Sequence, residues 1–505
     1  MEVRLPQVPS TQGLRRALRR QPLAATLAAV LAAAGVLPAS PIRADEPEAR
    51  AAPARHWSAP RQLADEQFQY HYVLHTRDLT LDHAGNALAQ WYTLGYDDQD
   101  GPTHTAYHRA GSSSWTLADS PAMLQNFPNA TTQPTRFSYD GASAWTGDGR
   151  ESSIYLARFD AATRSWRPLE TLTTPLWPVD VRTVVGASGN LALVWATGEP
   201  LIEPPPAGTP ALYGRCRTPA DGRWSGDVPV TGVLRADGDD FRLLGVLPLW
   251  NERVLVVWSA NTPAGARVAT AVWRPPCGGA GGVECYGATR LLPGRVTAVA
   301  FNRSGQGAAL IENDGGAGLQ ALLYEPARGW SAPRLLATGP VERESSQVVV
   351  NELGHLMIGW LAPASGDAAA PSRYVTGAVW GDWSGVRQAD TAGHKPLVAL
   401  DNLRGDALAV WQGPPLPDSY YSLAPHDLFA SRWVRATGEW TRPVAISRHV
   451  TTGASVGVYT SQEPRLAMTD DGRAAVLWVN NVPRHYDPSA PEVFPYGSPW
   501  VVTYE

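Results

Sequence analysis

One short phrase recurs along the chain and limits the available folds more than any other feature. Each copy has a turn of small or polar residues, usually with glycine, then a strand of alternating apolar residues, then a large apolar residue. The eight copies end at Trp91, Trp145, Trp195, Trp258, Ile311, Trp360, Trp411 and Trp478. They lie 49 to 67 residues apart, which is the spacing of propeller blades.

Each copy continues into further extended segments that end on a second aromatic residue. This place is held by Trp115, Trp166, Trp224, Trp330, Trp383 and Trp440, with Tyr286 near it in the fourth copy. One copy therefore contains four strands, A to D, joined by turns. The 20 Trp, 44 Pro and 47 Gly also suit short strands better than long helices. We predict an all-β fold, a single β-propeller of eight four-stranded blades, with seven blades as the alternative.

The two ends of the chain complete each other. HWSAPRQLA at 56–64 nearly repeats GWSAPRLLA at 329–337, which is a strand D, yet no complete copy precedes it. The eighth copy, in turn, stops after its strand C, SPWVVTYE at 498–505. We therefore expect the N-terminal strand to supply strand D of the last blade. Closing the ring in this way removes two exposed sheet edges.

The repeats resemble degenerate Asp-box repeats of secreted bacterial β-propellers of the sialidase-like kind. MTDDGRAAVLW at 468–478 and LDHAGNALAQW at 81–91 share the Asp, Gly and Trp of that motif, but Ala replaces its Thr. They also lie between strands A and B rather than C and D. The resemblance covers 56–505 and implies the architecture rather than an activity, because one fold hosts many functions.

Residues 1–44 have the pattern of an export signal: arginines at 15, 16, 19 and 20 precede an Ala/Leu-rich run too short to span a membrane. We predict a signal peptide at 1–44, a flexible linker at 45–55 and the propeller at 56–505, in a secreted or periplasmic protein. The alternative is a membrane anchor. Losing six arginines and one glutamate with the leader would move the net charge from −5 to −10. Such an acidic chain is unsuited to nucleic acid and favours neutral or cationic ligands.

The three cysteines are Cys216, Cys277 and Cys285. Cys277 and Cys285 bracket the glycine-rich CGGAGGVEC, which can fold back on itself. In an oxidising compartment they are expected to form a disulfide. The alternative is two free thiols.

The long links of the predicted blades are almost all B–C or D–A connections, which share one face of a propeller. In blades 7, 8 and 1, neighbours in the closed ring, these links are rich in aromatic and imidazole side chains that suit a carbohydrate. The candidate ligand residues are Tyr70, His71, His75, Tyr96, His104, Tyr420, Tyr421, His426, His449, Tyr459, His485, Tyr486 and Asp487. The alternative is a structural role, in which these side chains pack the loops against each other.

We therefore predict a monomeric, exported propeller that binds a glycan or an extracytoplasmic protein through this face. The alternative is a polysaccharide lyase or glycoside hydrolase with its site on the same face, because a His/Tyr pair can transfer protons. No cofactor is expected, although Asp97, Asp98 and Asp100 in YDDQDG could hold calcium; a solvated acidic loop is the alternative. GASVG at 453–457 fits G-x-S-x-G but lacks the strand–turn–helix setting of a nucleophile.

Overall fold

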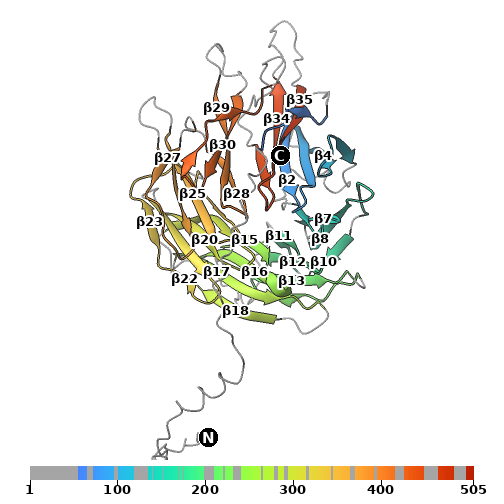
Figure 1. Cartoon of the computed structure of the whole chain (residues 1–505). Coiled ribbons are helices and arrows are strands. Elements are labelled where there is room, and N and C mark those ends of the chain that lie inside the picture. Colours follow the sequence, from blue (N-terminus) through green and yellow to red (C-terminus); the bar gives the residue numbers. More distant parts are fainter. Residues whose placement is uncertain are drawn as a thin grey trace, which may run out of the picture. The chain divides into compact units, whose positions relative to one another are not determined.

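The computed structural model consists of β-sheets, with no α-helix among the residues it describes (Figure 1). The chain divides after Ala54, and all described residues belong to the second unit, Arg55–Glu505. They are 55–505 without 65–71, 96–99, 119–134, 139, 151, 169, 175, 198–209, 220–221, 231–239, 263–264, 278–281, 289–293, 314–317, 343–344, 364–369, 390, 392–394, 416–425, 449–463 and 483–495.

Eight antiparallel sheets follow one another along the chain, one for each copy of the repeat. Blade 1 contains β2 (Tyr72–Leu81), β3 (Ala87–Gly95), β4 (Asp100–His108) and β5 (Trp115–Ala118). Blade 2 contains β6 (Arg136–Phe137), β7 (Ser143–Arg150), β8 (Ser153–Asp160), β9 (Ser165–Trp166) and β10 (Glu170–Thr173). Blade 3 contains β11 (Pro178–Val185), β12 (Leu191–Thr197), β13 (Leu212–Arg217) and β14 (Val228–Pro229). Blade 4 contains β15 (Asp240–Pro248), β16 (Val254–Thr262), β17 (Gly265–Arg274) and β18 (Gly282–Ala288), with a 3-10 turn at Trp250–Glu252.

The second half of the chain repeats this order. Blade 5 contains β19 (Gly294–Phe301), β20 (Gly307–Asn313), β21 (Leu319–Glu325), β22 (Gly329–Trp330) and β23 (Arg334–Ala337). Blade 6 contains β24 (Gln347–Val350), β25 (His355–Leu361), β26 (Ser372–Ala378) and β27 (Arg387–Ala389). Blade 7 contains β28 (Leu397–Leu400), β29 (Ala407–Pro415), β30 (His426–Val434), β31 (Glu439–Trp440) and β32 (Val444–Ala445). Blade 8 contains β33 (Arg465–Met468), β34 (Ala474–Val482), β35 (Tyr496–Tyr504) and β1 (Arg61–Gln62).

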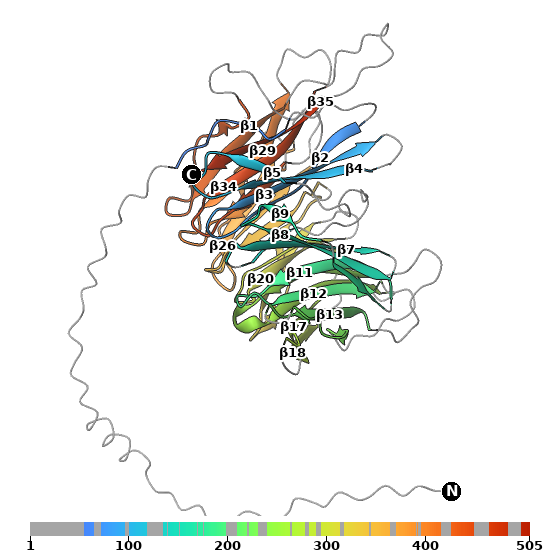
Figure 2. The ribbon, with the colours of Figure 1, turned by 90° about the vertical axis from the view of Figure 1, so that its right-hand side faces the viewer.

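The ring closes as the sequence predicts. Innermost strands of successive blades contact each other all the way round, including β33 of blade 8 against β2 of blade 1. At the seam, β1 pairs antiparallel with β35, with Gln62 opposite Trp500, and a bridge joins Trp57 to Tyr504 (Figure 2). Eight blades and the N-terminal strand as the missing strand D are both confirmed.

The glycine turn of the repeat is the link between strands A and B. In blade 6 the side chain of Asn351 accepts hydrogen bonds from the backbone N–H groups of Leu353 (3.1 Å) and His355 (2.8 Å). Gly354 completes the turn with φ of +75°, a conformation that costs a residue with a Cβ far more. The Asn351 amide also donates to the carbonyl of Asp401 in the next blade (2.8 Å), so these turns tie neighbouring blades together.

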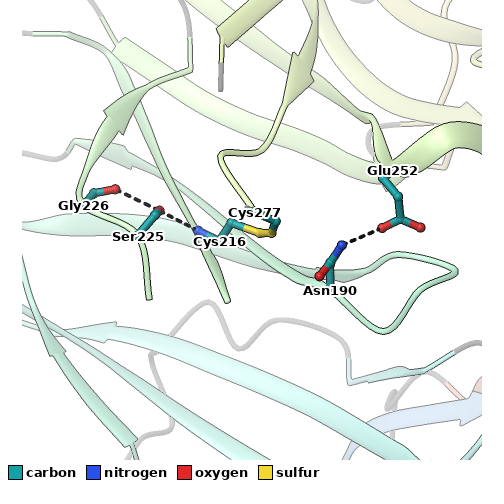
Figure 3. The surroundings of a disulfide bond; sticks show 6 residues. All are labelled: Asn190, Cys216, Ser225, Gly226, Glu252 and Cys277. Carbon is teal, nitrogen blue, oxygen red and sulfur yellow. Dashed lines mark hydrogen bonds between the residues drawn. A yellow bond between two sulfur atoms is a disulfide. The ribbon is translucent and has the colours of Figure 1, made fainter. Parts of the chain in front are cut away.

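The disulfide differs from the prediction: Cys277 pairs with Cys216, not with Cys285 (Figure 3). Cys216 lies on β13 of blade 3 and Cys277 follows β17 of blade 4, with Cα atoms 5.5 Å apart. Cys285 lies within β18, opposite Val272 of β17. The residues near in sequence are thus held apart by strand pairing, while the blade interface brings together two cysteines 61 residues apart. Closing a loop of that length stabilises the fold by about 4 kcal/mol in the chain-entropy model.

Candidate ligand site at the central channel

Most of the predicted ligand residues lie outside the part of the chain that the structure describes. These are Tyr70, His71, Tyr96, Tyr420, Tyr421, His449, Tyr459, His485, Tyr486 and Asp487, together with the calcium candidates Asp97 and Asp98. For His426 and Asp100 the structure gives the backbone alone, at the first residues of β30 and β4. Their roles stay predictions.

The two predicted histidines whose side chains are described both pack inside blade 1. The His75 ring stacks on Tyr92 of the neighbouring strand, with ring centroids 5.2 Å apart, and partial burial lowers its pKa. The His104 ring stacks on buried Trp91 at 5.6 Å. Both contacts follow from strand register, because His75 faces Tyr92 and His104 faces Trp91 across the ladders. The packing alternative expects contacts of this kind, and a role of these two histidines in ligand binding stays a prediction.

A different set of residues lines a cavity of about 370 Å³ along the axis of the propeller. Its walls come from the innermost strands and turns of blades 2 to 6, with Arg136, Arg182 and Arg303 beside Leu244, Gly245 and Glu352. A second hollow of about 210 Å³ shares Arg136 and Arg303 and extends to the A–B turn of blade 1. Inner strands present their side chains to the axis, so the fold itself creates this channel.

Asp78, in the second half of β2, interacts with arginines of both neighbouring blades. Burial raises the pKa of the Asp78 carboxyl, while the charges of Arg136 and Arg465 and the backbone N–H of Thr135 act against that rise. The Thr135 N–H donates to the carboxylate at 2.5 Å. Blades 8, 1 and 2 thus each place a charged group in one cluster.

Arg182 joins this cluster through a β-bulge. The register of β11 against β12 shifts between Val179 and Arg182, and Asp180 within the bulge has φ of +48°. The Asp180 carboxylate accepts from the N–H of Leu243 (3.1 Å), and Arg182 donates to the Leu243 carbonyl (3.3 Å). Burial lowers the pKa of Arg182, the Asp180 carboxylate raises it, and the nearby charge of Arg136 lowers it. The bulge therefore fixes Arg182 on the channel wall, a common use of such irregularities.

At the other end of the cavity, Arg303 and Glu352 form an ion pair of 3.8 Å between blades 5 and 6. The Glu352 carboxylate also accepts from the backbone N–H of Arg303 at 3.1 Å. Burial raises the pKa of Glu352, and the charge of Arg303 opposes this. Because Glu352 neutralises Arg303, the excess positive charge of the cavity lies at its opposite end, near Arg136.

Arg136 is the group on the channel wall best placed to bind a ligand. It is exposed, and among the described residues its guanidinium forms no hydrogen bond or ion pair. Together, Arg136, Arg182 and Arg465 outnumber the carboxylates of Asp78 and Asp180. A guanidinium presents a planar set of donors that fits a carboxylate or sulfate with two parallel hydrogen bonds. The site can therefore bind an anionic group, contrary to what the acidic net charge suggests.

None of these residues was among the predicted site residues, yet the sequence carries a signal for them. Arginine recurs in the innermost strand of six blades: Arg77, Arg136, Arg182, Arg242, Arg295 and Arg465. A search for residues shared by the copies outside the Trp phrase would have found it.

Two further properties concern the described residues as a whole. Among them, no group of three or more His, Cys, Asp or Glu side chains is arranged to hold a metal ion. Within the same residues, no helix has the length and hydropathy of a membrane span.

Comparison with known proteins gives no family: no family model matches the chain, and no curated protein sequence matches it. Among solved structures, the Dos1 propeller aligns with a TM-score of 0.48 and 8% identity, over 86% of this chain and 94% of that one. The WD40 domain of SCAP from fission yeast aligns with a TM-score of 0.47 and 7% identity, over 88% and 97%. A prolyl endopeptidase aligns with a TM-score of 0.44 and 13% identity, over 81% of this chain but only 54% of its own.

Proposed function

We propose that this chain is an exported β-propeller that binds an anionic glycan at the mouth of its central channel. The observation that carries the proposal is the exposed, unpaired guanidinium of Arg136 beside Arg182 and Arg465. Sulfate or carboxylate groups of a glycan are the anions such a cluster would bind, each arginine contributing charge-assisted hydrogen bonds. The leader-like pattern of 1–44 supports export.

The size of the site favours a glycan over a folded protein. A cavity of about 370 Å³ admits one or two sugar rings, since about 150 Å³ already admits benzene. The D–A links that precede β33 and β2 lead directly into strands carrying Arg465 and Asp78. Those links contain predicted ligand residues such as Tyr459 and Tyr70, whose aromatic rings are of the kind that stacks on sugars.

The test is calorimetric titration with a heparin hexasaccharide, as a sulfated probe, and with neutral maltohexaose. We expect the sulfated probe alone to bind, and Arg136→Glu to weaken it by about 10- to 100-fold, because a hydrogen bond to a charged group contributes about 1.5–3 kcal/mol. Arg109→Glu, at an exposed position in the outer turn after β4, is the matched control and should bind as the unaltered protein does.

Two results would contradict the proposal: equal affinity for the neutral hexasaccharide, or unchanged binding by Arg136→Glu with its fold intact. Chromatography of the oligosaccharide after incubation separates binding from cleavage. We expect it to be recovered intact, whereas shortened products would favour the lyase or hydrolase alternative.

A further inference from the structure

In several copies the tryptophan that ends the repeat packs toward the preceding blade, whereas Trp145 of blade 2 packs with Val185 and Leu191 of blade 3. In these copies its partner is the residue that stands immediately before the Trp position in the previous blade. Trp360 meets Leu310 in the core between blades 5 and 6, and Trp478 meets Val410 between blades 7 and 8. Trp258 and Val194 share the core between blades 3 and 4 in the same way.

Between blades 6 and 7 this rule fails, because the residue before Trp360 is Gly359. Strand alternation places Gly359 on the same side of β25 as Met357, which faces blade 7. Trp411 of blade 7 therefore finds no side chain at the place that Leu310 or Val410 fills elsewhere. A Cβ on Gly359 would lie 3.4 Å from Gln347 Nε2, an ordinary van der Waals contact, so a side chain at this position could be accommodated without a clash at its first atom.

The result is a cavity of about 350 Å³ between the two blades. Its apolar walls include Met357, Tyr374, Val398, Trp411 and Trp440. The rings of Tyr374 and Trp440 meet edge to face, with centroids 5.7 Å apart. The volume is roughly twice that of a cavity that binds benzene. It suits a molecule with two aromatic rings.

Polar groups in the same wall lack partners. Trp440 Nε1 is buried without a hydrogen bond among the described residues, but so are the Nε1 atoms of Trp273, Trp330, Trp433 and Trp500, so this donor alone does not mark a site. Arg373 and Arg442 also line the cavity, and neither guanidinium has an ion-pair or hydrogen-bond partner among the described residues. Partly buried Arg373 and exposed Arg442 therefore place two guanidinium groups beside mostly apolar walls, an arrangement that favours an anionic ligand.

We propose that the cavity between blades 6 and 7 binds a small, flat, two-ring aromatic acid. Its rings lie between Trp411, Tyr374 and Trp440, in the space that Gly359 leaves. Its carboxylate or sulfonate pairs with Arg373 and Arg442. This site is separate from the central channel and does not depend on the glycan proposed there.

The probe for this site is 8-anilinonaphthalene-1-sulfonate, a two-ring sulfonate whose fluorescence rises in apolar surroundings. We expect saturable binding of one molecule per folded chain. Gly359→Leu should weaken binding by at least about tenfold, because its side chain fills the cavity. Gly385→Leu, at an exposed glycine of the same blade with nothing within 4 Å, is the matched control and should change nothing.

Charge is tested separately from shape. Arg373→Gln should weaken the sulfonate several-fold but leave neutral N-phenyl-1-naphthylamine unaffected, and Arg136→Ala should affect neither dye. If Gly359→Leu fails to fold, Gly359→Ala replaces it and should weaken binding to a smaller degree. The proposal is overturned if the folded chain shows no saturable binding, or if both folded glycine variants bind the sulfonate as well as the unaltered protein does.

Discussion

Two of the hollows lined by the described residues arise in opposite ways. The axial channel exists because eight innermost strands surround it, and its polar walls carry Arg136, Arg182 and Arg303. The hollow between blades 6 and 7 lies where one copy of the repeat has Gly359 and five of the other seven copies have Leu or Val, and its walls are mostly apolar. The axial channel follows from the propeller fold itself, and arginine side chains give it its positive charge. The second is a local departure from the repeat, and such departures are where a repetitive protein acquires an individual site.

The largest effect is expected where the ring itself is opened, since both hollows require a closed ring. Deleting 56–64 removes β1 and the hydrogen bonds of His56 N–H to the Glu505 carbonyl and Leu63 N–H to the Pro499 carbonyl, both 2.9 Å. It exposes the edge of β35 to other chains. We expect aggregation, or a fall in Tm of more than about 10 °C, in calorimetry and size-exclusion chromatography. Deleting 46–54 is the control. A monomer of unchanged Tm after the first deletion would refute the closure.

A smaller effect is expected when the interface between blades 5 and 6 is compared with the one between blades 6 and 7, by the free energy of unfolding that each tryptophan contributes. Trp360 and Trp411 are equally buried, at 3% and 5% exposure, but only Trp411 borders the cavity. Trp360→Ala should lower the free energy of unfolding by about 3–5 kcal/mol, and Trp411→Ala by roughly 1–2 kcal/mol less, because fewer contacts are lost. Urea unfolding measures both. Equal losses would mean that Trp411 is packed as tightly as Trp360, and the interfaces would not differ.

The architecture could be predicted because its cause is repeated in the sequence. Each large apolar residue at the end of the phrase needs a neighbouring blade to bury it, and the turn of small or polar residues before it marks where strand A ends, so eight weak signals reinforce one another. The closure followed from an unpaired strand at each end, HWSAPRQLA and SPWVVTYE. Such reasoning works when every copy must satisfy the same packing and edge constraints.

The sites could not be predicted in the same way because they depend on contacts between copies. The Cys216–Cys277 pairing and the gap opposite Trp411 both require the relative register of two blades. The arginine cluster depends on the bulge at Asp180, which no spacing in the sequence reveals. The net charge, in turn, averages over the whole surface and hides a positive channel. His75 and His104 were selected by residue type, but strand register places their rings on Tyr92 and Trp91.

The most direct test of two distinct hollows is one competition measurement. The affinity of the heparin hexasaccharide is determined by calorimetry with and without saturating 8-anilinonaphthalene-1-sulfonate. The account predicts that both ligands bind the same molecule together, with the hexasaccharide Kd changed by less than about twofold, or about 0.4 kcal/mol. Displacement of the dye by the hexasaccharide, or a large rise in Kd with one shared stoichiometry, would contradict it and place both anions at a single site.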